Sequence, residues 1–153
     1  MLSRKRIDEL LDRWPVAVLA TLAADGTPRQ VPCVFARSGD SLWTPIDGKR
    51  KSERELARVS DIRRDPRVSL LLEKYGEDWS QLWWIRITAE AVVIELESEP
   101  PAGRFAAAAA ALRAKYPQYD ETPLFRARPT LVEIRPQRVS SWASGGGPSG
   151  AGA

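Results

Sequence analysis

The most informative stretch of the chain runs from residue 42 to residue 55 and reads Leu42-Trp43-Thr44-Pro45-Ile46-Asp47-Gly48-Lys49-Arg50-Lys51-Ser52-Glu53-Arg54-Glu55. A short apolar strand ends at Thr44, and a turn leads to three consecutive cations. Ser52 and Glu55 then have the spacing of a capping box, which predicts the start of a helix. Cations, free backbone N–H groups and the positive end of a helix dipole therefore meet in one place. This combination predicts a binding site for phosphate or another anion.

Runs of charge are usually solvated surface loops, and that alternative applies here too. The position of this run, after a strand and before a capped helix, favours anion binding. We therefore predict that Lys49, Arg50 and Lys51 hold a phosphorylated small molecule.

The amino-acid composition excludes several kinds of functional site. The 153 residues are enough for one domain with a buried core, and 43% of them are apolar. The net charge of +3 is too small to favour nucleic acid. The chain has no histidine and one cysteine, Cys33, which excludes a histidine triad, a disulfide and a cysteine metal cluster. We expect no catalytic side chain and no metal site. No signal peptide or membrane span is recognisable, so we expect a cytoplasmic protein with no membrane partner.

Hydrophobic periodicity predicts an ordered series of elements. Helices are expected at Ser3–Arg13, from Ser52 to Asp65 and from Ser98 to Pro117. Strands are expected at Val16–Leu22, Gln30–Ala36, Ser41–Thr44, Val68–Leu72, Leu82–Leu96 and Thr130–Trp142, the last interrupted by Pro136. Tight turns at Ala24–Thr27 and Ser38–Asp40 make the first three strands a predicted meander.

Strands outnumber helices and adjoin through hairpins. The fold class is therefore mainly β (α+β), an antiparallel barrel with peripheral helices rather than a doubly wound sheet. We predict one domain over residues 1–142. The remaining Gly/Ala/Ser segment, residues 143–153, is predicted to be a flexible tail.

Four segments resemble the pyridoxamine 5′-phosphate oxidase-like family of flavin-binding split β-barrels. They are Val18–Pro28, Leu42–Thr44 with the cationic run, Asp65–Leu71 and Trp79–Ile87, which occur in the family's order together with Trp142. The segment Glu77–Arg86 is similar to the branch that uses the deazaflavin coenzyme F420. The resemblance implies a split barrel, a homodimer and two cofactor sites in the subunit interface.

The resemblance also assigns cofactor-binding positions. Lys49 and Lys51 would hold the phosphate or the acidic tail of the cofactor, and Arg50 would share that role or point to solvent. The other positions border the tricyclic ring, bind the phosphate or line the partner's side of the site: Thr21, Pro32, Val34, Thr44, Trp83, Trp84 and Arg86. Trp83 and Trp84 should point to opposite faces of their strand.

The function that this resemblance implies is hydride transfer between bound F420 and a small organic substrate. An FMN-dependent oxidoreductase is the alternative, since both cofactors share a tricyclic ring and a ribityl phosphate. Arg4, Lys5 and Arg6, or Arg54 and Arg58, would extend the basic groove for the acidic tail of F420. A further alternative is a non-catalytic protein that carries a flavin-like or tetrapyrrole-sized ligand. Pyridoxamine phosphate oxidases use an Arg-x-His pair on the substrate phosphate, and this chain lacks it, so it should not oxidise pyridoxine or pyridoxamine phosphate.

Overall fold

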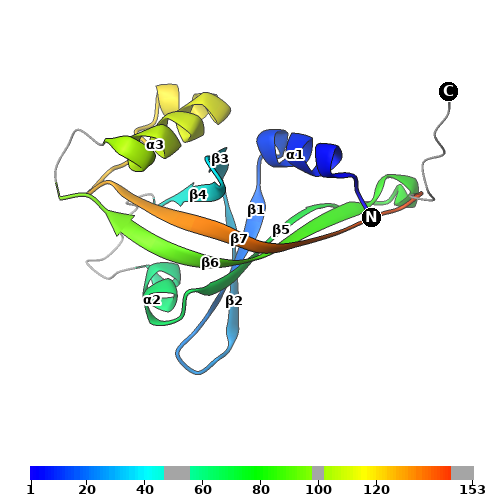
Figure 1. Cartoon of the computed structure of the whole chain (residues 1–153), viewed down its shortest axis with the longest axis horizontal. Coiled ribbons are helices and arrows are strands. Elements are labelled where there is room, and N and C mark those ends of the chain that lie inside the picture. The colour runs from blue at the N-terminus through cyan, green and yellow to red at the C-terminus, as the bar shows by residue number, and fades with distance from the viewer. Residues whose placement is uncertain (47–55, 98–101, 146–153) are drawn as a thin grey trace.

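The computed structural model describes residues 1–46, 56–97 and 102–145. Figure 1 shows how their helices and strands are arranged. The α-helices are α1 (Arg4–Arg13), α2 (Ala57–Arg64) and α3 (Gly103–Lys115), and two short 3-10 helices are η1 (Trp79–Gln81) and η2 (Pro117–Asp120). The strands are β1 (Ala17–Leu22), β2 (Pro28–Cys33), β3 (Ala36–Ser38), β4 (Ser41–Pro45), β5 (Arg67–Lys74), β6 (Trp83–Glu95) and β7 (Thr130–Ala143).

The seven described strands form one antiparallel sheet in the order β2-β1-β5-β6-β7-β4-β3. The long β6–β7 pair is its middle, with α1 and α3 on one side of this pair in the view and α2 on the other (Figure 1). Consecutive residues Val34 and Phe35 connect β2 to β3, which are the two ends of the order. The chain therefore brings the sheet ends toward each other, which gives the predicted antiparallel split barrel.

The predicted meander of three strands is wrong. The segment expected as a single strand, Gln30–Ala36, is divided between β2, which pairs with β1, and β3, which pairs with β4. The hydroxyl of Tyr116 explains the break: it accepts a hydrogen bond from the Phe35 N–H at 3.0 Å and donates to the Phe35 carbonyl at 2.9 Å. Because a side chain 81 residues away satisfies this buried backbone, Phe35 needs no strand partner.

Strand β7 is continuous through Pro136, although an interruption was predicted there. Arg138 is opposite Thr88 and Pro136 is opposite Ala89, so Gln137 is the extra residue of a β-bulge. Proline has no N–H to give to the ladder, and a bulge is where a sheet tolerates it. The strand continues to Ala143, one residue into the predicted tail, and residues 146–153 lie outside the described part of the chain.

Helix α1 begins at its predicted start, whereas α2 and α3 each begin after the residue predicted to open them, Ser52 and Ser98, and Ser98 lies outside the described residues. The Ser3 hydroxyl accepts a hydrogen bond from the Arg6 N–H at 3.1 Å, which caps α1. Helix α2 begins at Ala57, and Leu56, its N-cap residue, has extended backbone angles and no side-chain cap. The helix start predicted at Ser52 is therefore wrong; Ser52 and Glu55 themselves lie outside the described residues.

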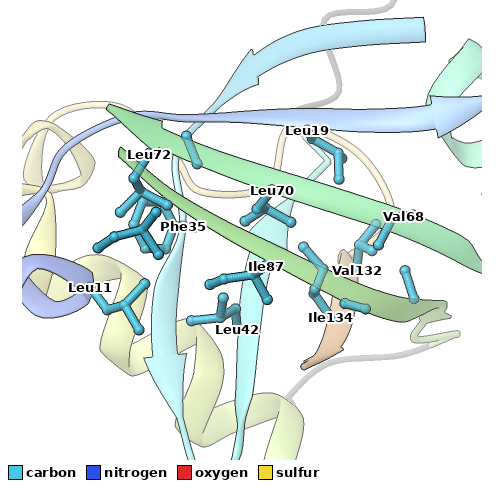
Figure 2. Packing of buried hydrophobic residues seen from close by; sticks show 14 of the residues in the cluster. Leu11, Leu19, Phe35, Leu42, Val68, Leu70, Leu72, Ile87, Val132 and Ile134 are labelled. Atoms are coloured by element: carbon cyan, nitrogen blue, oxygen red, sulfur yellow. The ribbon is translucent and has the colours of Figure 1, made fainter. Parts of the chain in front are cut away.

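The main core lies inside the barrel and is built from every second residue of the strands. Leu19, Leu70 and Ile87 point toward one another from β1, β5 and β6, and Leu11 of α1 covers one end with Phe35 (Figure 2). A second cluster packs Phe105, Ala108, Ala109 and Leu112 of α3 against Trp43 of β4. The small residues of the alanine run allow this close approach.

Two neighbouring residues at the end of α3 predict how stability depends on alkaline pH. Burial lowers the pKa of Lys115 to about 8 and raises the pKa of Tyr116 to about 12. Between about pH 8 and 10.4 an unfolded chain keeps the Lys115 proton that the folded chain loses, so this group makes the fold more stable as pH rises. Between about pH 10 and 12 the folded chain keeps the Tyr116 proton that the unfolded chain loses, so this group makes the fold less stable.

We expect these slopes in urea unfolding curves measured from pH 7 to 12. The free energy of unfolding of the wild type minus that of Lys115→Met should rise with pH from about pH 8. The free energy of unfolding of the wild type minus that of Tyr116→Phe should fall with pH above about pH 10. Flat differences in these windows would show that the two groups titrate alike in both states.

Candidate functional site

A hollow of about 280 Å³ lies where the end of β2 meets β4, and we call it the β2–β4 hollow. Three predicted cofactor-binding residues, Pro32, Val34 and Thr44, line it together. Its other lining residues are Val16, Cys33, Pro45, Arg58 of α2 and Tyr119 of η2. The wall is therefore mostly apolar, with one cation and two hydroxyl groups as its polar exceptions.

Arg58 brings a buried polar atom to this hollow. Its Nε atom is buried and has no hydrogen-bond partner in the described structure. A buried donor without an acceptor is costly, so its presence at a hollow indicates a place for an anionic acceptor. A phosphate oxygen is an acceptor that suits a guanidinium.

The cationic run is tied to this hollow by chain connectivity. Lys49, Arg50 and Lys51 lie outside the described residues. The segment to which they belong leaves the described structure after Ile46, next to Thr44 and Pro45, and returns at Leu56, two residues before Arg58. Both of its ends are thus at the β2–β4 hollow, which agrees with a shared anion site.

Thr21 lies elsewhere. Its hydroxyl donates to Asp61 of α2 at 2.7 Å, and the side chain is buried. Asp61 also accepts from Arg29 of β2 at 3.1 Å and from Arg64 at 3.0 Å, and these bonds hold the pKa of this buried carboxyl below its usual range against the effect of burial. Thr21 therefore fastens α2 to β1, and α2 carries Arg58.

Trp83 and Trp84 point to opposite faces, as predicted. Trp83 is buried and meets Trp14 edge to face, with ring centroids 4.7 Å apart. Trp84 is half-buried on the outer face of the sheet, and the Arg86 guanidinium lies 5.2 Å from its ring centroid. Neither tryptophan nor Arg86 lines the β2–β4 hollow of its own chain.

The hollow and the tryptophan face are nevertheless connected across the outer face of the sheet. Pro32 is opposite Val18, Val18 is opposite Leu71, and Leu71 is opposite Arg86. Arg86 is thus three strands from Pro32 in one row, a distance of about 14 Å at about 4.8 Å per strand. Trp84 and Arg86 therefore do not meet Pro32 within one copy of the chain.

Sequence reasoning missed four lining residues, Val16, Cys33, Pro45 and Tyr119, and placed Arg58 only among the cations for a cofactor tail. Burial raises the pKa of the Cys33 thiol, so Cys33 is a neutral residue of the wall rather than a thiolate. Its side chain also forms a hydrogen bond with the side chain of Thr44. One sequence signal could have pointed to Arg58. It is four residues before the apolar Ile62, which is buried, and residues four apart share one face of a helix. Tyr119 gave no local signal.

Two other kinds of site are not found in the part of the chain that the structure describes. There, no three His, Cys, Asp or Glu side chains lie close enough to hold a metal ion. A search of the same residues finds no helix whose length and apolar character would let it span a membrane.

The strand order and the position of the hollow define the class of split-barrel proteins. The family model described as Pyridoxamine 5'-phosphate oxidase matches residues 3–143, so the chain belongs to this family. Among curated proteins, none matches.

Solved structures agree on the fold. A conserved hypothetical protein from Mycobacterium tuberculosis is 24% identical, with a TM-score of 0.72 and coverage of 94% of this chain and 86% of that one. HutZ, the heme storage protein from Vibrio cholerae, is 16% identical, with a TM-score of 0.70 and coverage of 95% and 96%. A protein described as F420 reductase is 21% identical, with a TM-score of 0.60 and coverage of 87% and 94%. These low identities concern the fold alone.

Proposed function

We propose that this chain is an oxidoreductase that binds coenzyme F420 and transfers a hydride between it and a small organic substrate. The observation that carries the proposal is the β2–β4 hollow, where the unpartnered Nε of Arg58 and the Thr44 hydroxyl lie on either side, in the sequence, of the segment that contains the cationic run. When bound, the deazaflavin supplies the redox chemistry, which needs no protein nucleophile.

The residues of the hollow fit the phosphate end of such a cofactor. A volume of about 280 Å³ is at the small end for a ligand pocket, so it takes the phosphate and its linker but not the tricyclic ring. The ring would extend past Pro32 onto the outer face of β1, where Val18 offers an apolar surface. Arg58, Lys49 and Lys51 would bind the phosphate, and the apolar wall would exclude water from the ring.

The alternatives are an FMN-dependent oxidoreductase and a non-catalytic carrier. FMN has the same ribityl phosphate, so the hollow suits both cofactors. Heme is named in the descriptions of two structural relatives. Iron in heme is held by His, Cys, Met or Tyr side chains, and this chain has no histidine, one cysteine, one methionine and three tyrosines. Cys33 and Tyr119 line the hollow, but the unpartnered Nε of Arg58 beside them favours a phosphorylated cofactor.

The first test is a titration of the purified protein with F420, with FMN and with hemin, followed by quenching of tryptophan fluorescence. Replacing both Lys49 and Lys51 with alanine should weaken the binding of the preferred cofactor at least tenfold, because each lysine would bind an anion. Reduced F420 should then be turned over by a conjugated acceptor. Tight binding of FMN alone would move the protein to the flavin alternative, and unchanged affinity in the double variant would contradict the role of the lysines.

We also propose a homodimer in which each copy supplies Trp84 and Arg86 to the site of the other. Trp84 is paired with Trp142, which is 39% exposed, and Val18 and Leu71 continue the apolar outer face. A C2 interface uses the same patch on both subunits, so one patch must contain both contacting groups. The outer face of this sheet contains both, since it carries Pro32 at the edge of the β2–β4 hollow and also Trp84.

Replacing Trp84 with aspartate is expected to convert a dimer into a monomer, because each copy would have to bury a carboxylate in an apolar interface. Size-exclusion chromatography with light scattering measures this change, and Ala107→Asp on an exposed position of α3 is the matched control. A wild-type protein that remains monomeric at high micromolar concentration would contradict the proposed interface.

A further inference from the structure

A second, larger groove lies between α1 and the C-terminal half of β7, and we call it the α1–β7 groove. Its volume is about 1160 Å³, and Leu2, Ile7, Leu11, Val139 and Ala143 provide its apolar lining. Val139 is opposite the buried Ile87, so its side chain is on the core face of the sheet, yet it is 45% exposed. Helix α1 therefore leaves part of the core face of β7 uncovered.

The groove cannot close by a simple movement of α1, because both ends of this helix are fixed. At its start the Leu2 N–H donates to the Ser141 hydroxyl of β7 at 2.9 Å. At its end Lys115 of α3 donates to the Leu11 carbonyl at 3.1 Å, and the Tyr116 hydroxyl is 2.9 Å from the Pro15 carbonyl. An apolar opening held in this way is a preformed site rather than a packing defect.

The edge of the groove is cationic. Arg4 and Arg6 line it, and the only carboxylate in its lining is that of Asp8, which is already paired with Arg37 at 2.9 Å. Arg6 has an exposed partner in Glu9 at 3.3 Å, and such pairs are weak and easily exchanged. Cations in the first turn of a helix also oppose its dipole, so an anion beside them would relieve a local conflict.

We propose that the α1–β7 groove binds an amphipathic carboxylate, with its aliphatic chain along Ile7 and Val139 and its carboxylate at Arg4 and Arg6. An apolar lining alone would accept any hydrophobic chain, and cations alone would accept any anion. Their combination selects a molecule that has both, such as a medium-chain fatty acid. This site is built from other elements than the β2–β4 hollow, and the proposal does not rest on the proposed function.

The test uses decanoate as the probe, below the concentration at which it forms micelles, with isothermal titration calorimetry on the full chain. We expect binding of one decanoate per chain, with no heat from butyrate or from decyltrimethylammonium. The double variant Arg4→Glu/Arg6→Glu and the single variant Val139→Asp should each weaken decanoate binding at least tenfold. Arg113→Glu, an exposed charge reversal on α3, is the matched control and should bind as the wild type does.

Several results would overturn the proposal. Equal binding of decyltrimethylammonium would show that charge plays no part, and unchanged binding by Val139→Asp would place decanoate elsewhere. Binding to anionic phospholipid vesicles without binding of monomeric decanoate would assign the cations to a membrane surface. Release of bound F420 by decanoate would assign them to the cofactor tail instead. Titration of the same variants with FMN and F420 reports on the β2–β4 hollow separately.

Discussion

Replacing Asp61 with alanine is expected to lower the free energy of unfolding by about 2–4 kcal/mol. The Asp61 side chain is 1% exposed and joins three partners from two strands and its own helix, namely Thr21, Arg29 and Arg64. The two arginines are about half exposed and can be hydrated after the change. Thr21 is buried, so its hydroxyl would be left without a partner, and that penalty is the largest part of the loss.

Urea unfolding of the wild type and of three variants separates these contributions. Thr21→Val alone should cost less than Asp61→Leu alone, and Thr21→Val/Asp61→Leu should cost less than the sum of the two because both buried polar groups are removed together. If the double variant is as unstable as the sum of the single changes, Thr21 and Asp61 are not coupled and the explanation fails.

The same carboxyl predicts a dependence on acid. Its pKa is held below the ordinary value in the folded chain, so its contribution is present above about pH 4 and is lost as pH falls through the folded value. The difference in stability between wild type and Asp61→Ala should therefore shrink below about pH 4. A difference that stays constant down to pH 2 would show that Asp61 acts through packing alone.

The local elements were predictable because their signals lie within a few residues. Ser3 marks the start of α1, and Gly26, whose φ is +83°, follows Asp25 in the turn between β1 and β2. Apolar runs rich in β-branched residues predicted β1, β5 and β6, the order of the elements predicted an antiparallel barrel, and the resemblance specified a split barrel.

What sequence reasoning missed depends on distant contacts. The division of Gln30–Ala36 into β2 and β3 is caused by Tyr116, which is far along the chain, and no pattern near Phe35 reveals it. Thr21 has the alternation of a strand residue, and only the structure shows that its hydroxyl is taken by Asp61. Both residues are therefore explained by tertiary hydrogen bonds rather than by local propensity.

Helix α2 carries both a residue that stabilises the fold, Asp61, and a residue of the proposed site, Arg58. Asp61 fastens this helix to β1 and β2, and Arg58 lies almost one turn earlier at the β2–β4 hollow. Loosening α2 would therefore move Arg58 relative to Thr44. Asp61→Ala should weaken cofactor binding as well as the fold, whereas a change at Arg58 should affect binding with little effect on unfolding.

Replacing Arg58 with alanine is expected to weaken the binding of F420 or FMN by about 10- to 100-fold, because a charge-assisted hydrogen bond contributes about 1.5–3 kcal/mol. Stability should change little or rise, since the change removes a buried Nε that has no partner. Fluorescence titration measures the affinity and thermal unfolding measures the stability.

Two further variants make the Arg58 result specific. Arg113→Ala removes the same charge from an exposed residue of α3 that does not line the hollow, and it should bind the cofactor as the wild type does. Arg58→Lys keeps the charge and loses the planar fork, so it should recover only part of the affinity. Raising the salt concentration should weaken wild-type binding more than binding by Arg58→Ala, since one ionic contact is missing. If Arg58→Ala binds both cofactors as tightly as the wild type, the phosphate is not in the β2–β4 hollow, and the unpartnered Nε is only a cost of folding.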